Sequence, residues 1–169
     1  MSASFENRYY ATDEMMMEYV HQVLCRRLKR WGIGLLLLGL LSIVHFISKG
    51  DSIWVAVDGV CLFIILFCII FSPILMIRSI KENDKRIHNG KKFETVVTFD
   101  DKISICEGSF SLSVEYSQIV AIYYLKHSYA LMFGKNSGII VSPSGFIGTD
   151  VDNFKAFIEK KCNNAKVVS

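Results

Sequence analysis

Hydrophobic positions in this chain fall into two long uninterrupted runs and, further on, into short alternating runs. The long runs cover residues 32–48 and 59–77, and neither contains Asp, Glu, Lys or Arg. The second extends upstream to Ile53 if one carboxylate, Asp58, is tolerated. A charge-free apolar run of about 18 residues is long enough for a transmembrane helix. The pattern therefore predicts a transmembrane hairpin with spans near residues 31–48 and 53–77.

Two other interpretations of these runs fit the surrounding chain poorly. A cleaved signal peptide does not fit, because 30 residues with a charged amphipathic stretch come first and no small-residue cleavage site follows. A hairpin buried in a soluble protein would need more surrounding chain than 169 residues provide, since both helices are apolar on every side. We therefore expect the lipid bilayer to be a partner of this chain.

Residues 1–30 form a lead-in with its own pattern. Residues 5–10 alternate in part and are aromatic, which predicts a short strand. Thr12 is a suitable N-cap, and two acidic residues follow where the helix dipole favours them. Apolar side chains then recur at helical spacing, and the basic stretch 26–30 is expected to complete this helix.

From residue 93 the hydrophobic period changes. Short runs of β-branched, aromatic or alternating residues are separated by turn residues. These runs cover residues 93–99, 103–105, 110–114, 119–125, 129–133 and 138–141. Six closely spaced strands are typical of an antiparallel barrel or sandwich.

A final helix follows, which Thr149 or Asp150 can cap. Its apolar side chains form one stripe, which consists of Val151, Phe154, Phe157, Ile158 and Cys162. The expected fold class is membrane α+β: a two-helix transmembrane hairpin plus a small antiparallel β-barrel or sandwich closed by a C-terminal helix. The expected segments are the lead-in 1–30, the hairpin 31–77, a basic connector 78–92 and the β-rich domain 93–169.

Charge predicts the orientation of the hairpin. Lys and Arg gather on its two outer flanks, and the loop between the spans carries only Lys49. The positive-inside rule then places both termini in the cytoplasm, which gives residues 5–10 a route back to the later sheet. The basic residues expected to contact lipid headgroups are Arg26, Arg27, Lys29, Arg30, Arg78, Lys81, Lys85 and Arg86. The net charge of +3 follows from this fringe, so we expect no nucleic-acid partner.

A search of the sequence for catalytic and metal-binding patterns finds none. The five cysteines contain no CxxC pair. Cys61 and Cys68 lie in the second apolar run, and the other three are expected in reducing cytoplasm, where disulfides are not expected. No two of the four histidines lie three or four positions apart, and a single His–Cys pair at that spacing, His21 with Cys25, is too few ligands for a local zinc site. Walker A, nucleophile-elbow and paired-carboxylate motifs are absent. We therefore expect no enzyme activity, no cofactor and no metal. A metal site assembled from residues far apart in the chain is the alternative that the sequence leaves open.

Two polar residues interrupt the apolar runs at similar depth. His45 lies three residues before the end of the first run, and Asp58 lies five residues into the widened second run. A carboxylate at bilayer depth is costly and usually pairs or meets water. One hypothesis is that His45 and Asp58 pair across the hairpin for ligand recognition or proton sensing. The alternative, which the pattern favours, is that Asp58 lies in the interface and the span starts at Gly59.

The order of elements resembles two known architectures. Six or seven strands followed by one amphipathic helix is similar to a pleckstrin-homology-like (PH-like) domain, and the whole chain resembles a YcxB-like family protein. The segments that carry this resemblance are 10–14 (YATDE), 89–92 (NGKK), 97–101 (VTFDD), 116–119 (YSQI), 140–143 (IVSP) and 154–158 (FKAFI). The resemblance implies a bacterial inner or cytoplasmic membrane protein and carries over no active site.

Two functions remain open at this point. The first is a scaffold or regulatory protein whose cytoplasmic domain binds a protein partner, a second copy of the chain or the lipid surface. The aromatic and basic stretch 123–127 with Lys135 is a candidate binding edge, although an ordinary strand and turn explains it better. The alternative is an immunity or envelope-stress protein that protects the membrane against a toxin or bacteriocin, which a neighbouring toxin gene would favour.

Overall fold

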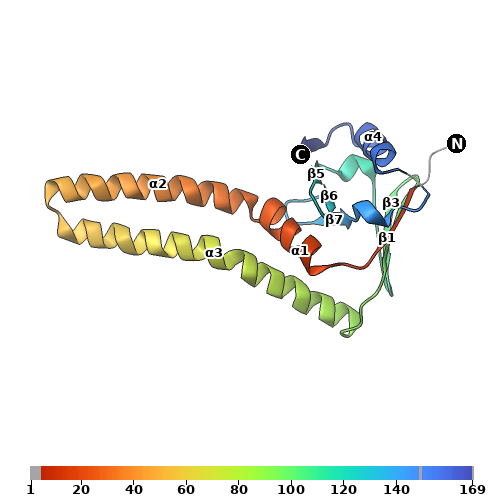
Figure 1. Cartoon of the computed structure of the whole chain (residues 1–169), viewed down its shortest axis with the longest axis horizontal. Coiled ribbons are helices and arrows are strands. Elements are labelled where there is room, and N and C mark those ends of the chain that lie inside the picture. The colour runs from red at the N-terminus through yellow and green to blue at the C-terminus, as the bar shows by residue number, and fades with distance from the viewer. Residues whose placement is uncertain (1–4, 149, 169) are drawn as a thin grey trace. The chain divides into compact units, whose positions relative to one another are not determined.

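The computed structural model describes residues 5–148 and 150–168 and divides the chain into two compact units (Figure 1). One unit, the helical hairpin, covers Val20–Ile80. The other, the β-module, combines Met1–Tyr19 with Lys81–Ser169. The β-module is therefore built from both ends of the chain, and the hairpin is an insertion within it.

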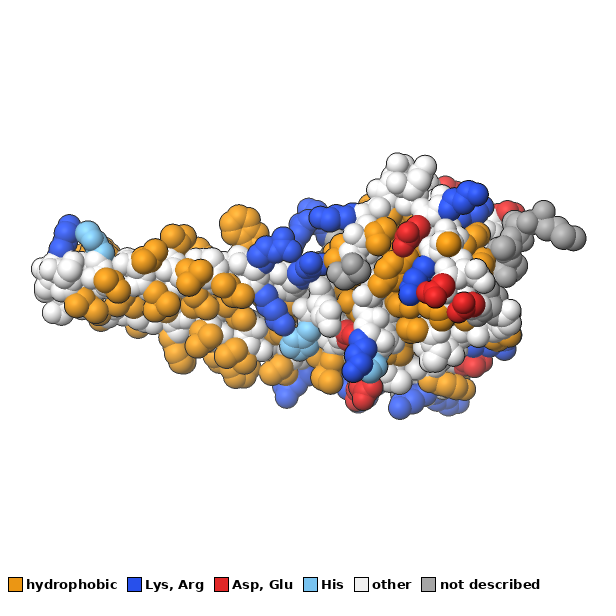
Figure 2. Space-filling model, turned by 45° about the horizontal axis from the view of Figure 1, so that its top comes forward, with side chains coloured by type: hydrophobic (Ala, Val, Ile, Leu, Met, Phe, Trp, Pro, Cys, Tyr) orange, Lys and Arg blue, Asp and Glu red, His pale blue; other side chains and the backbone are white. Residues whose placement is uncertain are grey.

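Two long helices form the hairpin, α2 at Arg26–Lys49 and α3 at Ser52–His88, and the last residues of α3 belong to the β-module. Both helices are long and apolar enough to cross a membrane. Most of their apolar side chains are exposed, as the hydrophobic surface of the helices in Figure 2 shows. Gly50 ends α2 with a φ of 75°, and its N–H donates to the carbonyl of Ile47.

Glycines on α2 allow the two helices to pack closely. A Cβ built on Gly39 would lie 2.5 Å from the side chain of Leu62, and one on Gly32 would lie 2.5 Å from Ile69. Small residues at helix contacts are a common device for close packing of apolar helices.

The lead-in helix is shorter than expected. Helix α1 covers Asp13–Tyr19, and the N–H of Met15 donates to Oγ1 of Thr12 at 3.2 Å, which confirms the predicted N-cap. The prediction that residues 26–30 complete this helix is wrong. A π-helical turn at Val20–Leu24 follows α1, the chain bends at Cys25, and the basic stretch forms the beginning of α2.

The first sheet joins the two ends of the chain. Its strands are β1 (Phe5–Tyr9), β2 (Thr95–Phe99), β3 (Ile103–Glu107) and β4 (Phe110–Val114), all antiparallel in the order β1-β2-β3-β4. Phe5 pairs with Phe99 and Tyr9 pairs with Thr95. The return of residues 5–10 to the later sheet is therefore confirmed.

The second sheet has the order β7-β6-β5-β8. Its strands are β5 (Ala121–Tyr124), β6 (Tyr129–Met132), β7 (Gly138–Val141) and β8 (Lys166–Val168). Two expectations need correction here. The described residues form two four-stranded sheets and no closed barrel, and the chain does not end on its helix, because β8 follows and pairs parallel to β5.

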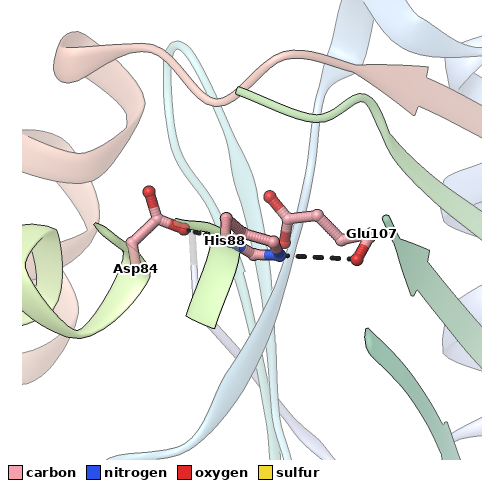
Figure 3. A group of neighbouring side chains, drawn as sticks. All are labelled: Asp84, His88 and Glu107. Atoms are coloured by element: carbon pink, nitrogen blue, oxygen red, sulfur yellow. Dashed lines mark hydrogen bonds and ion pairs between the residues drawn. The ribbon is translucent and has the colours of Figure 1, made fainter. Parts of the chain in front are cut away.

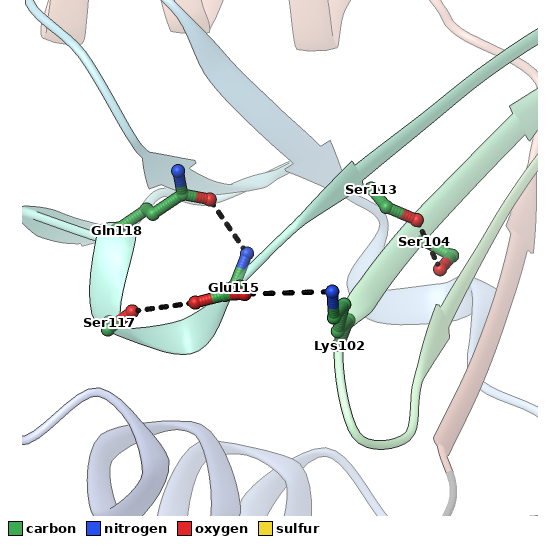
Figure 4. Close-up of polar contacts among 6 residues, drawn as sticks. All are labelled: Lys102, Ser104, Ser113, Glu115, Ser117 and Gln118. Atoms are coloured by element: carbon green, nitrogen blue, oxygen red, sulfur yellow. Dashed lines mark hydrogen bonds and ion pairs between the residues drawn. The ribbon is translucent and has the colours of Figure 1, made fainter.

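A short 3-10 turn at Tyr116–Gln118 carries the chain from the first sheet to the second. Figure 4 shows its polar contacts: the N–H of Glu115 donates to Oε1 of Gln118 at 2.9 Å, and Ser117 donates to the Glu115 carboxylate at 3.4 Å. Lys102 lies 3.6 Å from the same carboxylate. The turn is thus held by its own side chains and by the β2–β3 loop.

The core of the β-module combines both sheets with helix α4 at Val151–Lys161. Phe154 and Ile158 are fully buried, and the Phe154 ring lies 4.8 Å from the ring of Phe99 and 5.8 Å from that of Phe5. Asp150 occupies the N-cap position without a side-chain cap bond, and Thr149 lies outside the described residues. Buried aromatic contacts therefore attach α4 to the first sheet.

Candidate functional site

Three titratable side chains lie together where the end of α3 meets the first sheet. Asp84 and His88 lie one helical turn apart near the end of α3, and Glu107 is the last residue of β3 (Figure 3). One ligand atom from each lies within 4.8 Å of the others. Spacing of four places Asp84 and His88 on one helix face, and the end of β3 brings Glu107 to them.

The His88 ring lies between the other two residues in Figure 3. Its Nδ1 is 2.9 Å from Oδ1 of Asp84, and its Nε2 is 3.4 Å from the backbone carbonyl oxygen of Glu107. The side chain of His88 is only 5% exposed, while that of Asp84 is 53% exposed. The cluster therefore has a buried imidazole and opens to solvent through Asp84.

Phe93 and Gly108 form one wall of this cluster. The rings of His88 and Phe93 are 5.3 Å apart. Gly108 has a φ of 58°, and a Cβ built there would lie 3.0 Å from the Phe93 ring. Glycine at the β3–β4 turn thus satisfies the backbone conformation and leaves room for the aromatic ring.

Both neighbours of the His88 ring are hydrogen-bond acceptors, so the two ring nitrogens both carry protons when these bonds form. The hydrogen bond to Asp84 also favours the protonated ring and raises the pKa of His88, whereas burial lowers this pKa. Burial raises the pKa of Glu107, and the charge of His88 lowers it. Two carboxyl groups thus share one imidazolium, which leaves an excess of negative charge when both are ionised.

Tyr9 and Thr95 extend the polar contacts beside the cluster. Thr95 is buried and pairs in register with both Tyr9 and Glu107 across the sheet. The hydroxyl of Tyr9 donates to the carbonyl of Ile140 at 2.7 Å, and burial raises the pKa of Tyr9. Tyr9 is therefore a neutral donor that ties the first sheet to the second.

A second polar contact covers the stretch expected as a binding edge. The carboxylate of Glu18 accepts hydrogen bonds from the N–H groups of Lys126 and His127, both at 2.8 Å, and from Oγ of Ser128 at 3.3 Å. Tyr124 donates to the carboxylate of Glu159 at 2.9 Å. These bonds give the 123–128 segment a structural role in holding α1 and α4 to the second sheet.

The two polar residues of the hairpin are not hydrogen-bonded to each other within the part of the chain that the structure describes. The His45 ring contacts the ring of Phe46 at 5.6 Å. Oδ2 of Asp58 is buried and has no hydrogen-bond partner among residues 5–148 and 150–168. Their pairing for ligand recognition or proton sensing stays a prediction.

The basic residues expected at lipid headgroups lie in two groups. Arg26, Arg27, Lys29 and Arg30 open α2, and Arg78, Lys81, Lys85 and Arg86 lie along the later part of α3. Lys29 Nζ lies 2.9 Å from Nδ1 of His21, and Lys81 forms an ion pair of 2.7 Å with Asp13. Their contact with lipid stays a prediction.

The cluster of Asp84, His88 and Glu107 was missed by reasoning from the sequence. A search for His or Cys three or four positions apart overlooks a pair of Asp and His at the same spacing. The Asp84–His88 spacing is visible in the sequence, but Glu107 comes to it only through the fold.

Comparison with known protein families gives a match over part of the chain. The model of the YcxB-like protein family matches residues 99–159, which run from the end of β2 into α4. The resemblance to this family is therefore confirmed over a little more than one third of the chain. No curated protein and no solved structure matches the chain.

Proposed function

We propose that this chain, which matches the YcxB-like family over residues 99–159, is a non-enzymatic, membrane-anchored binding protein of the bacterial cytoplasmic membrane. Its hairpin spans the bilayer, both termini lie in the cytoplasm, and the β-module is a PH-like domain with a scaffold or regulatory role. The observation that carries the proposal is the pairing of β1 with β2 across the inserted hairpin.

The exposed surface of the hairpin supports insertion. Leu38 is 64% exposed and Phe63 is 69% exposed, and many other apolar side chains of α2 and α3 are similarly open. Exposed apolar surface costs about 25 cal/mol per Å² in water, and contiguous patches of this kind mark membrane or protein contacts. Length, composition and exposure together favour the bilayer as the contact.

Strand pairing supports the topology. β1 precedes the hairpin and β2 follows it, so both flanks of the hairpin must lie on the same side of any membrane that it crosses. The hairpin unit carries 6 Lys and Arg against 2 Asp and Glu, and 5 of these 6 cations lie outside the loop. The positive-inside rule then favours the cytoplasm for this side.

The order of elements supports a PH-like domain. A four-stranded antiparallel sheet is followed by the antiparallel strands β5, β6 and β7 and then by α4, which packs on the core. The parallel strand β8 is an addition to that order. Fold alone does not specify a ligand, so the ligand is argued from the surface.

The charge of the β-module favours a protein partner over the lipid surface. The module carries 13 Lys and Arg against 14 Asp and Glu, so it has no excess of positive charge to attract anionic lipid. We place the partner at β4, the open edge of the first sheet. The other edge, β1, is covered by the bonds of Ile147 to Glu6 and of Phe146 to Asn7.

The edge at β4 has the properties of a strand-addition site. Its sequence, Phe-Ser-Leu-Ser-Val, contains no Lys, Arg or Pro, which are the residues that usually protect an edge. Phe110 is 43% exposed at its beginning. An extended segment of a partner protein can pair with the free backbone groups here and place a side chain against Phe110.

Site-specific photocrosslinking in living cells tests this function. A photoreactive residue replaces Phe110 in the full-length protein, and the matched control replaces Val167, which is equally exposed on the edge strand β8. We expect an adduct with another protein from position 110 and none from position 167. Equal adducts at both positions, a lipid adduct or a self-adduct only would contradict the proposed partner.

A further inference from the structure

Asp84, His88 and Glu107 form a cluster that neither membrane anchoring nor partner binding requires. An exposed ion pair on a helix needs two residues, but here a second carboxyl group from β3 is held beside the same imidazole. Glu107 is partly buried beside a second carboxyl group, an arrangement that a bound cation stabilises.

We propose that Asp84, His88 and Glu107 form a binding site for a divalent first-row transition-metal ion. This inference is independent of the proposed function. The three residues offer one imidazole nitrogen and two carboxylate oxygens within 4.8 Å of one another. Three protein ligands with open positions for water are a common arrangement for Zn²⁺, and the imidazole favours such ions over Mg²⁺ and Ca²⁺.

Ring orientation assigns roles to the two nitrogens of His88. Nε2 points to the backbone carbonyl of Glu107 at 3.4 Å, and Nδ1 points to Asp84 at 2.9 Å. Metal-ligating histidines usually donate their second N–H to a carbonyl or carboxylate, which orients the ring. Nδ1 is therefore the metal ligand: it loses its proton to solvent on binding, and Asp84 changes from hydrogen-bond acceptor to second ligand.

Burial and access also suit an ion. The imidazole is held by the wall of Phe93 and Gly108, while Asp84 is more than half exposed and provides the entrance. A bound ion would tie the last turn of α3 to the β3–β4 turn, within the β-module.

Metal binding to the full-length protein in detergent micelles tests the proposal. After treatment with EDTA and its removal, Zn²⁺ binding is measured by titration calorimetry, and Co²⁺ binding by its visible absorption. We expect one ion per chain with a dissociation constant of about 10 μM or tighter, and no displacement by millimolar Mg²⁺. Thiolate ligation of Co²⁺ would appear as a charge-transfer band, which we expect to be absent.

Variants locate the site. Asp84→Asn and Glu107→Gln should each weaken Zn²⁺ binding by about 100-fold or more, because loss of an outer partner alone commonly costs 10–100-fold. His88→Asn should abolish binding. Glu82→Gln, which removes an exposed carboxylate from the same helix, and Cys106→Ser, which removes the thiol next to Glu107, should leave affinity within about threefold.

Asp84→Asn keeps the test decisive if the buried His88 variant does not fold, since Asp84 is exposed and its replacement is tolerated in size. Failure of the wild-type protein to bind Zn²⁺ at about 100 μM would overturn the proposal and leave the cluster as a structural ion pair. Undiminished binding in both Asp84→Asn and Glu107→Gln would also overturn it.

Discussion

Asn7 and Ser142 form a reciprocal pair of buried hydrogen bonds across 135 positions of the chain. Nδ2 of Asn7 donates to the carbonyl of Ser142 at 2.7 Å, and the N–H of Ser142 donates to Oδ1 of Asn7 at 3.1 Å. Asn7 is completely buried. Its amide therefore acts as a backbone partner that closes the end of β7 onto β1, so the N-terminal strand is attached to both sheets.

Replacing Asn7 tests this attachment. Asn7→Ala removes both bonds and leaves the buried N–H of Ser142 without its partner, while the Ser142 carbonyl keeps the hydrogen bond from the N–H of Gly145. We therefore expect the free energy of unfolding to fall by about 1–3 kcal/mol. Urea unfolding of the full-length protein in detergent, followed by the near-ultraviolet circular dichroism of its tyrosines, measures the change. Asn136→Ala, at an exposed loop asparagine, is the control. A change of less than about 0.5 kcal/mol for Asn7→Ala would contradict the role of the pair.

Glu18 is expected to protect the β5–β6 turn. Its carboxylate accepts the N–H groups of Lys126 and His127, so Glu18→Ala should raise hydrogen exchange at these two amides by about tenfold, equivalent to about 1.4 kcal/mol of local stability. Glu18→Gln, which retains one acceptor oxygen, should have a smaller effect. Glu14→Ala on the same helix is the control. Unchanged exchange at both amides in Glu18→Ala would show that the bonds do not limit opening of the turn.

Gly39 is expected to be intolerant of a side chain, whereas Gly34 is not. Gly39→Val drives the new side chain into Leu62, so we expect the hairpin to lose about 1–3 kcal/mol of stability. Nothing lies within 4 Å of a Cβ at Gly34, so Gly34→Val serves as the matched control on the same helix. Fluorescence of Trp31 and Trp54 during denaturation in SDS reports the hairpin. Equal losses for the two variants would argue against close packing at Gly39.

Tyr19 makes stability depend on alkaline pH. Burial raises the pKa of Tyr19 to about 12, above its ordinary value of 10.0, so the folded protein favours the neutral phenol. The contribution of neutral Tyr19 to the free energy of unfolding is complete below pH 10. It is lost as the pH rises from 10 towards 12, because Tyr19 ionises in the unfolded chain before it ionises in the folded protein. Tyr19→Phe should therefore reduce the loss of stability in this interval by about 1–2 kcal/mol, measured by urea unfolding at successive pH values. An unchanged pH profile in Tyr19→Phe would show that other tyrosines account for the alkaline loss.

Secondary structure followed closely from the sequence in the β-module. The six expected strands all occur, and β5 is shorter than its expected range, 119–125, by two residues at the beginning and one at the end. The N-cap at Thr12 could also be predicted from the sequence, because capping depends on residues three positions apart. Errors arose at Cys25, where a helical period continues through a bend, and at β8, whose three residues are too few to show a period.

The sequence by itself determined which segments are apolar on every side, which alternate and where the cations gather. These are local properties, since each depends on neighbours within a few residues. Only the tertiary structure decided that β1 pairs with β2 across the inserted hairpin, that Asn7 is buried on Ser142, and that Glu107 reaches Asp84 and His88. Such pairs are distant in the chain, and the packing of the sheets, which no local pattern encodes, brings them together. The same reason explains why the spacing of strands left a barrel and a sandwich both open, whereas the described residues form two four-stranded sheets and no closed barrel.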